Sequence, residues 1–532
     1  MSRKIIAFFM CFVVLLTCFA GCTKDKTNKA FYFAISEMPR YFDPQVAQST
    51  GEKMIAVNIF DGLFKLSENG EIVKCAVSDY SVSADGLVYT FKIRNDLKYY
   101  ISSSAQDFIE EKNAEISKNI TAHDFAFGIV RSVLPETKAS AFSLVSAIKN
   151  AVAVNKGELA KEELGVKVID DYTLEITLEY ANKDFLYALT QPVSFPCDEE
   201  FFNLTAGRYG LDNEYLISNG AFYLSSVNDE KSVKISKNSE YVGDFSAIPA
   251  SVTFFLNADS VDVAKKVKKG TYDCGFFSTD EAKNELGNKT VKTDLDNITR
   301  ALLFNTQNEY LKNVNLRVGL ASCVEKTTIP NESFDYIIPS FYKLLGVEIE
   351  NNKIEINSYN IEAAREKLVD AFDELDIKTL TVEVLCTAKY EQVAKLVVNS
   401  WQKNIGVELV GVVKVVEDAE FQSKIKKGEY QVAIYPFTVD SQNAIMFASM
   451  FTTDSPLNNF GYASTEYDKL FAELEKTQSM DSLCACESHL LKNAVVLPLY
   501  KEQTTFALSK NVEGVYFCND SANVYFYKGL KE

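Results

Sequence analysis

The sequence predicts an α/β protein composed of several lobes. Helical and strand patterns alternate along the whole chain of 532 residues, without low-complexity linkers or obvious repeats. Hydrophobic residues make up 47% and charged residues 24% of the chain, which is the profile of a folded globular protein. A chain of this length exceeds one ordinary hydrophobic core, so two or three domains are expected.

Three helices are predicted from apolar residues that recur with the helical period. In residues 390–405 this stripe comprises Val393, Leu396, Val397, Trp401 and Ile405. A second stripe marks residues 361–372, and a third marks residues 465–474. Thr465, with Asp468 three residues later, predicts a capping box at the start of the third helix.

Strands are predicted from the alternation of apolar and polar side chains. Residues 173–179 alternate in this way and indicate a half-buried strand. The Asp-Gly dipeptide at 85–86 predicts the turn of a hairpin. Residues 430–434 alternate as another strand, which Pro436 is expected to end because proline cannot donate to a ladder. Asp440 then stands in the loop beyond this strand, where α/β folds tend to bind ligands.

The first residues are predicted to form a targeting segment. Arg3 and Lys4 form a positive start, and residues 5–20 are apolar apart from one threonine. Residues 19–22, Phe-Ala-Gly-Cys, resemble the lipobox of bacterial lipoproteins, which implies cleavage before Cys22 and lipid attachment to it. An uncleaved anchor helix is the alternative. Both interpretations place the body of the protein outside the cytoplasm, because the positive end stays inside.

Charge and cysteine usage exclude some classes of function. The formal net charge of −18 argues against a nucleic-acid partner, whose phosphates require lysine and arginine. Of the eleven cysteines, the eight that follow Cys22 are scattered without the spacing of zinc ligands. In a large domain such residues are more often small buried side chains than disulfides, so mostly free thiols are predicted.

The sequence shows no constellation of catalytic residues. Only two histidines occur, His123 and His489, and neither has a second histidine nearby, so a site built from several histidines is excluded. No phosphate-binding loop, dinucleotide fingerprint, nucleophile elbow or calcium loop is present. These absences weaken the hypothesis of an enzyme, and no cofactor or metal is expected.

Many segments in order resemble the bacterial extracellular solute-binding proteins of family 5, which are the oligopeptide and dipeptide receptors of ABC importers. Any one segment would be weak, but together they cover nearly all of the mature chain. The similar segments are "YFDPQVA" (41–47), "VNIFDGLFKL" (57–66), residues 77–99, "ITAHDFAFGIVRSV" (120–133), "LGVKVIDDYTLEITLE" (164–179), "SNGAFYLSS" (218–226), "KISKNSEYV" (234–242), residues 302–321, "SWQKNIGVEL" (400–409), "YASTEYDKL" (462–470) and "VVLPLYKEQ" (495–503).

This resemblance implies a periplasmic-binding-protein type II clamshell, with mixed sheets, two lobes joined by hinge strands, and an extra domain inserted in lobe I. The hinge strands are expected near residues 300–305 and 493–500. The implied division is a signal peptide at 1–21, a flexible tether at 22–30, lobe I at 31–56, 182–300 and 494–532, the inserted domain at 57–181, and lobe II at 301–493.

The resemblance also implies ligand-binding residues. In peptide-binding relatives, the aspartate at the position of Asp440 pairs with the ligand's α-ammonium, and the aromatic residue at the position of Phe437 lines the cleft. A turn aspartate that bonds its own backbone is the alternative for Asp440. Further candidates are Tyr435, Tyr500 at the second crossover, and Tyr41 and Phe42 in the early loop.

The function implied is an extracytoplasmic lipoprotein that captures short peptides and delivers them to an ABC transporter permease, anchored through Cys22 and expected to be a monomer. Alternatives are the same fold binding a nickel chelate, a sugar or another small molecule, and a tethered extracellular hydrolase. Two departures bear on the ligand. The single tryptophan, Trp401, belongs to a predicted core stripe, and residues 416–421 are acidic where relatives place cleft aromatics. Phenylalanine and tyrosine must then line the cleft.

Overall fold

A ten-stranded sheet runs through the centre of the protein. The computed structural model describes residues 28–531, except 183–184, 229–230, 346, 350–353, 357, 407, 440–442, 456 and 519–522. The strand order is β16-β15-β17-β12-β18-β11-β1-β10-β9-β8. In this order the strands are Leu409–Val416, Leu380–Thr387, Val432–Phe437, Thr290–Phe304, Val496–Ser509, Cys274–Phe277, Ala30–Ile35, Ser251–Leu256, Ser232–Lys237 and Phe222–Asn228.

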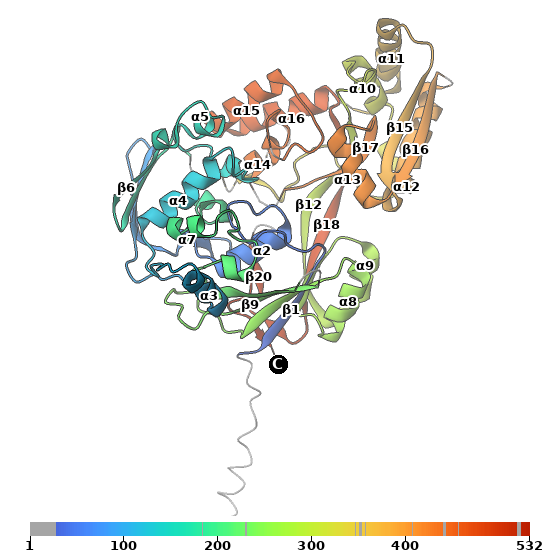
Figure 1. The fold of residues 1–532 in the computed structure, drawn as a ribbon. Coiled ribbons are helices and arrows are strands. Elements are labelled where there is room, and N and C mark those ends of the chain that lie inside the picture. The colour runs from blue at the N-terminus through green and yellow to red at the C-terminus, as the bar shows by residue number, and fades with distance from the viewer. Residues whose placement is uncertain are drawn as a thin grey trace, which may run out of the picture.

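The two longest strands, β12 and β18, connect the two ends of this sheet (Figure 1). They pair antiparallel with one another. Residues 299–304 of β12 also pair with β17, whereas residues 505–508 of β18 also pair with β11. A register shift interrupts their ladder between Leu295 and Ile298. The crossovers expected near 300–305 and 493–500 thus coincide with the end of β12 and the start of β18, while the lobe boundaries stay a prediction.

A separate four-stranded sheet lies within residues 57–181. Its order is β4-β5-β7-β6, and the predicted hairpin at 85–86 joins its first two strands. Short two-stranded ribbons accompany the two sheets. The strands of the four-stranded sheet are Val77–Val82, Val88–Ile93, Thr173–Thr177 and Val166–Asp170, and those of the ribbons are β2 Phe64–Leu66 with β3 Ile72–Lys74, β13 Lys343–Leu344 with β14 Val347–Glu348, β19 Val512–Glu513 with β22 Leu530–Lys531, and β20 Tyr516–Phe517 with β21 Val524–Tyr525.

Helices cover both ends of the large sheet. They are α2 Thr50–Ile59, α3 Ser103–Glu111, α4 Ala122–Val133, α5 Ala151–Asn155, α6 Phe185–Ala188, α7 Glu199–Leu204, α8 Ser260–Lys269, α9 Asp280–Leu286, α10 Val314–Ser322, α11 Ile361–Leu375, α12 Glu391–Ile405, α13 Asp418–Lys427, α14 Ala444–Ser449, α15 Thr465–Thr477 and α16 Met480–Lys492. As expected, Trp401 of α12 is a core residue. It is fully buried, and its indole Nε1 donates to the carbonyl of Leu320 at 2.9 Å.

Two local predictions are corrected by the structure. The N-cap of α15 is Ser464 rather than Thr465, because the Ser464 hydroxyl accepts the hydrogen bond from the backbone of Tyr467. Pro436 does not end its strand, since β17 continues to Phe437 and the proline faces Arg300 on β12. The strand is buried on both faces, because its alternate residues pack in two different hydrophobic clusters.

The targeting segment, the tether and Cys22 lie outside the described residues. Among the described residues, no helix has the length and apolar character needed to cross a bilayer. The eight cysteines of the described part are all buried and form no disulfide with one another, in agreement with the prediction of thiols. Burial raises the pKa values of Cys75, Cys197 and Cys274, which makes these thiols poor nucleophiles.

Candidate functional site

A cavity of about 240 Å³ lies at the carboxyl ends of three strands of the large sheet. β1 is parallel to both β10 and β11, so all three strands end on the same side. The first turns of α2 and α8 close the cavity from above these ends. Carboxyl ends of parallel strands are where α/β folds usually bind ligands. The lining residues are Phe33, Ala34, Ile35, Ser36, Glu37, Thr50, Gly51, Met54, Asn257, Ala258, Ser260, Val263, Gly275 and Phe276.

The edge of β1 beside this cavity is open. β1 pairs with β10 along all six of its residues, from Ala30 to Ile35. With β11, in contrast, it forms a single pair among the described residues, between Phe33 and Cys274. Beyond Phe33 the two strands line the cavity from opposite sides. The main chain at Ala34, near the end of β1, and at Ser36, just after it, therefore borders a space that an extended ligand segment can enter. The carbonyl of Ile35 is on the other edge, where it accepts a hydrogen bond from the amide of Asn257 at 2.9 Å.

A buried glutamate fixes the loop that follows β1. The Glu52 carboxylate, on α2, is 4% exposed. It accepts hydrogen bonds from the backbone amides of Arg40, Tyr41, Gln48 and Ser49 at 2.8–3.2 Å. Two of these bonds belong to the loop and two to the helix cap, so Glu52 locks the loop onto the start of α2.

Tyr41 and Phe42, two of the predicted ligand-binding residues, lie in this loop with opposite environments. The Tyr41 ring is 43% exposed, whereas Phe42 is buried and its amide donates to the carbonyl of Gly210. The next residue, Asp43, forms a buried ion pair with Arg131 of α4 at 2.6 Å. Asp43 thus has a structural role. Of the two aromatic candidates, Tyr41 is the one that presents its side chain to solvent.

The strands on either side of β12 carry three more of the predicted ligand-binding residues, Tyr435, Phe437 and Tyr500, but these do not share one face of the sheet. Tyr435 and Phe437 of β17 pack in one hydrophobic cluster, and Tyr500 of β18 packs in another. All three are at most 9% exposed. Burial raises the pKa of Tyr435 to about 12. None of these residues lines the cavity at β1, and a role for them in ligand binding stays a prediction.

A charged cluster that the sequence analysis missed sits on the same strands. Arg300 of β12 and Glu502 of β18 form an ion pair at 2.7 Å, and both side chains are nearly buried. The Arg300 guanidinium stacks 3.9 Å from the centre of the Tyr390 ring, and the Tyr390 hydroxyl donates to Glu502 at 3.2 Å. Burial lowers the pKa of neighbouring Lys389, whose ammonium lies 3.7 Å from Glu502. The one local sign of this cluster in the sequence is that Arg300 stands directly before the apolar residues 301–304.

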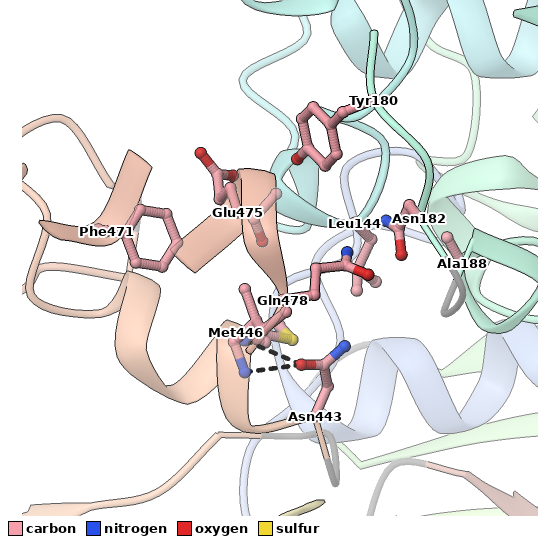
Figure 2. A pocket seen from close by; sticks show the side chains of 11 residues that line it. Leu144, Tyr180, Asn182, Ala188, Asn443, Met446, Phe471, Glu475 and Gln478 are labelled. Atoms are coloured by element: carbon pink, nitrogen blue, oxygen red, sulfur yellow. Dashed lines mark hydrogen bonds between the residues drawn. The ribbon is translucent and has the colours of Figure 1, made fainter. Parts of the chain in front are cut away.

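A second, narrower cavity lies where residues 143–188 meet α14 and α15 (Figure 2). Its volume is about 30 Å³, enough for one or two water molecules. In Figure 2, Tyr180 and Asn182 face Phe471 and Glu475 across it. The Ser146 hydroxyl donates to Glu475 at 3.3 Å, and Leu144 packs against the cluster that contains Met446. Segments assigned to different predicted lobes are therefore in contact here.

Desolvation dominates the electrostatics of this contact. Burial raises the pKa of Glu475, and the hydrogen bond from Ser146 only partly opposes this shift. Burial also raises the pKa of Tyr180, with a further contribution from the Glu475 charge. Both groups are therefore more stable in their neutral forms than they would be in water.

Asp440 lies outside the described residues, but both ends of its loop are anchored. The amide of Val439 donates to the Tyr342 hydroxyl at 3.1 Å, and that hydroxyl donates to the carbonyl of Asn297 at 2.8 Å. On the other side, Asn443 caps α14. The role of Tyr342 in holding this loop was not predicted from the sequence, because its partners Val439 and Asn297 are far from it along the chain. Among the described residues, no cluster of three or more metal-ligating side chains occurs.

Comparison with known proteins assigns this fold. Residues 71–459 match the model of the bacterial extracellular solute-binding proteins, family 5 Middle. The chain is 23% identical to the dipeptide-binding protein DppE of Bacillus subtilis, over 92% of this chain and 90% of that protein. It is also 23% identical to the periplasmic oligopeptide-binding protein OppA of Salmonella typhimurium, over 86% and 84% of the two chains.

Solved structures match over nearly the whole chain. The structure of Listeria monocytogenes OppA bound to peptide covers 95% of this chain and 99% of its own, with a TM-score of 0.77 at 21% identity. The complex of Haemophilus influenzae OppA with the peptide RPPGFSPFR gives the same coverage, with a TM-score of 0.76 at 21% identity. The α/β binding-protein fold expected from the sequence is confirmed. The family model spans well over half of the chain, and the protein therefore belongs to family 5 of the bacterial extracellular solute-binding proteins, a family of binding proteins and not of enzymes.

Proposed function

We propose that the protein captures short peptides outside the cytoplasm and delivers them to an ABC transporter permease. The observation that carries this proposal is the incomplete pairing of β1 with β11 beside a cavity of about 240 Å³. A peptide carries amide donors and carbonyl acceptors at the regular spacing of a β-strand, whereas the polar groups of a sugar or a metal chelate do not repeat at that spacing. The relatives named above, a dipeptide-binding and an oligopeptide-binding protein, also support a peptide as the ligand.

The peptide would be held mainly through its own backbone. An extended segment placed along β1 continues the hydrogen-bonding pattern that β11 leaves incomplete, and this mode does not depend on the sequence of the ligand. Side chains without a direct protein contact would be accommodated through water. Asp440 is proposed to bind the terminal ammonium, because a carboxylate and an ammonium form a strong charge-assisted hydrogen bond in a closed cleft.

Anchoring through Cys22 completes the proposal. A lipid on this residue would hold the receptor at the membrane, where peptide can pass to the permease. The segment between Cys22 and β1 is short and polar, and it would serve as a flexible tether.

Thermal unfolding of the full chain purified in detergent tests the function. The melting temperature is measured with alanine peptides of two to six residues, with free amino acids, with sugars and with nickel chelates. A rise that occurs only with peptides and follows their concentration supports the proposal, because a ligand that binds the native state alone stabilises it. Stabilisation by a sugar or a chelate, with none by peptides, would contradict it.

A further inference from the structure

The cavity at the carboxyl ends of β1, β10 and β11 has an apolar interior and a polar mouth. Phe33, Ile35 and Met54 form buried walls, each at most 5% exposed. Val263 and Phe276 extend this apolar surface. The polar lining residues are Ser36, Glu37, Thr50, Asn257 and Ser260, which lie after the strands or in the first turns of the helices.

The size of the cavity suits one large side chain. Its volume is about 240 Å³. An apolar cavity of about 150 Å³ in another protein is large enough to bind benzene. A phenylalanine or leucine side chain therefore fits here, and alanine would leave most of the space unfilled. An unfilled apolar cavity forgoes the dispersion contacts that its walls could make, which favours a ligand that fills it.

The chemistry of the walls selects against a charged side chain. The one charged residue of the lining, Glu37, is exposed, so its carboxylate is solvated and does not line the interior. A lysine or glutamate side chain placed between Phe33 and Met54 would lose its hydration without gaining a buried partner, which is unfavourable.

The open edge of β1 places a ligand backbone next to these walls. Ala34 and Ser36 lie beside the gap between β1 and β11, and both also line the cavity. Because successive side chains of an extended segment point to opposite sides, one side chain of a peptide on this edge can enter the cavity while its neighbours point away. We propose that this cavity is a specificity pocket for one bulky apolar side chain of a bound peptide. This inference rests on the proposed function and adds the side-chain class that the site selects.

Gly51 offers a way to block the pocket. It lies in the first turn of α2 and lines the cavity. A Cβ added there would lie 3.6 Å from Ile35 Cγ2 and 3.9 Å from Pro39 Cγ, which are ordinary contacts. A Gly51→Leu substitution should therefore extend into the cavity and fill part of it. Gly51→Ala is the matched control, because alanine favours the helix but leaves the cavity open.

The test measures affinity by calorimetry for alanine peptides that carry a single Phe, Leu, Lys or Glu at each position in turn. In the unmodified protein, Phe or Leu at one position should raise affinity roughly 10- to 100-fold over alanine, as expected for burying such a side chain. Gly51→Leu should abolish this preference, so that the Phe, Leu and all-alanine peptides bind the variant with similar affinity. Gly51→Ala should retain the preference.

The outcomes separate the pocket from the function. If all-alanine peptides bind but no position prefers Phe or Leu, the specificity pocket is wrong and peptide capture stands. A folded Gly51→Leu protein that keeps the preference would also overturn the pocket. If no peptide binds to the unmodified protein, the proposed function itself fails.

A spectroscopic readout covers the case in which Gly51→Leu does not fold. Met54 is one of seven methionines, so its methyl resonance can be followed in protein labelled at methionine methyl groups and assigned with Met54→Leu. The Phe-containing peptide should shift the Met54 methyl signal strongly because of its ring current, and the all-alanine peptide should shift it little. An unchanged Met54 signal at saturating Phe peptide would exclude the pocket.

Discussion

Ser146 and Glu475 lie 329 residues apart in the sequence, and the Ser146 hydroxyl donates a hydrogen bond to the Glu475 carboxylate at 3.3 Å. The bond joins a segment of the predicted inserted domain to helix α15 of predicted lobe II. Desolvation at this contact raises the pKa of Glu475 above its ordinary value of 4.5. The contact between the two segments is therefore coupled to pH.

Replacing Glu475 should make the contact less sensitive to pH. A carboxyl whose pKa is raised in the folded protein contributes stability that is fully present below pH 4.5 and is lost as pH rises through the folded pKa. Glu475→Gln keeps an acceptor for Ser146 and removes the charge, so the variant should gain stability relative to the unmodified protein as pH rises from 4.5 to 8. Unfolding by urea at several pH values measures this difference. A constant difference over that range would contradict the coupling.

Removing one partner of the Arg300–Glu502 ion pair should lower the stability of the protein strongly. Glu502→Ala should destabilise the protein by about 3–5 kcal/mol, because it leaves a buried guanidinium without its carboxylate. The double variant Arg300→Met/Glu502→Leu should recover much of the loss, because it removes both charges. Glu68→Ala is the control. Glu68 pairs with Lys528 at the exposed surface, and its loss should change stability by less than about 1 kcal/mol. Equal effects of the two single substitutions would contradict the prediction.

The sequence predicted local structure well because its signals are local. The apolar stripe of α12 and the hairpin turn at Asp85-Gly86 both depend on residues a few positions apart, and both are present. The resemblance to a known family supplied the fold. What could not be predicted depends on contacts between distant segments.

The cavity at β1 illustrates this limit. It arises because β1 and β11 pair at one position among the described residues, and the sequence of neither strand indicates where the pairing stops. Tyr342 and the Arg300–Glu502 pair are likewise defined by partners far away in the chain. The same reasoning explains the error at Pro436. Its missing donor is tolerated within β17 because β17 pairs with its neighbour β15 only at Val432 and Ala433, so the strand continues past the proline.

Asp440→Ala should weaken peptide binding while leaving the fold intact. If Asp440 pairs with the ligand ammonium, its removal should reduce the affinity by about 2–5 kcal/mol, because an interfacial charge is left without its partner. Acetylation of the peptide amino terminus should have a similar effect on the unmodified protein and almost none on the variant. Calorimetry with both peptides and both proteins measures the coupling. Identical affinities for the two proteins would show that Asp440 is a turn residue.

Cys22→Ala should abolish lipid labelling of the expressed protein. A thioether lipid requires the cysteine sulfur, so metabolic incorporation of a labelled fatty acid should be lost and the protein should be released or accumulate as its precursor. Cys18→Ala, in the apolar segment, is the matched control and should label normally. Labelling that persists in Cys22→Ala would show that the attachment residue was misidentified.

Glu487 on α16 should make the stability of the whole protein depend on pH near neutrality. Its Oε1 accepts hydrogen bonds from the amides of Ile337 and Ile338, while Oε2 is buried and has no hydrogen-bond partner within the described part of the chain. Burial raises the pKa of Glu487 to about 7 from 4.5. The raised value means that this group's contribution to stability is complete below pH 4.5 and is lost as pH rises through 7, a change of roughly 2–4 kcal/mol.

A glutamine at this position tests that expectation, because it retains the acceptor for both amides and does not ionise. The unfolding free energies of Glu487→Gln and the unmodified protein should be compared by urea titration at pH 5 and pH 8. Titrating groups common to both proteins cancel in this comparison, so the variant should gain roughly 2–4 kcal/mol relative to the unmodified protein at the higher pH. Glu466→Gln, at an exposed carboxylate of α15, should show no such gain. A difference that is the same at both pH values would mean that Glu487 is ionised in the folded protein throughout this range, in contradiction to the effect of its burial.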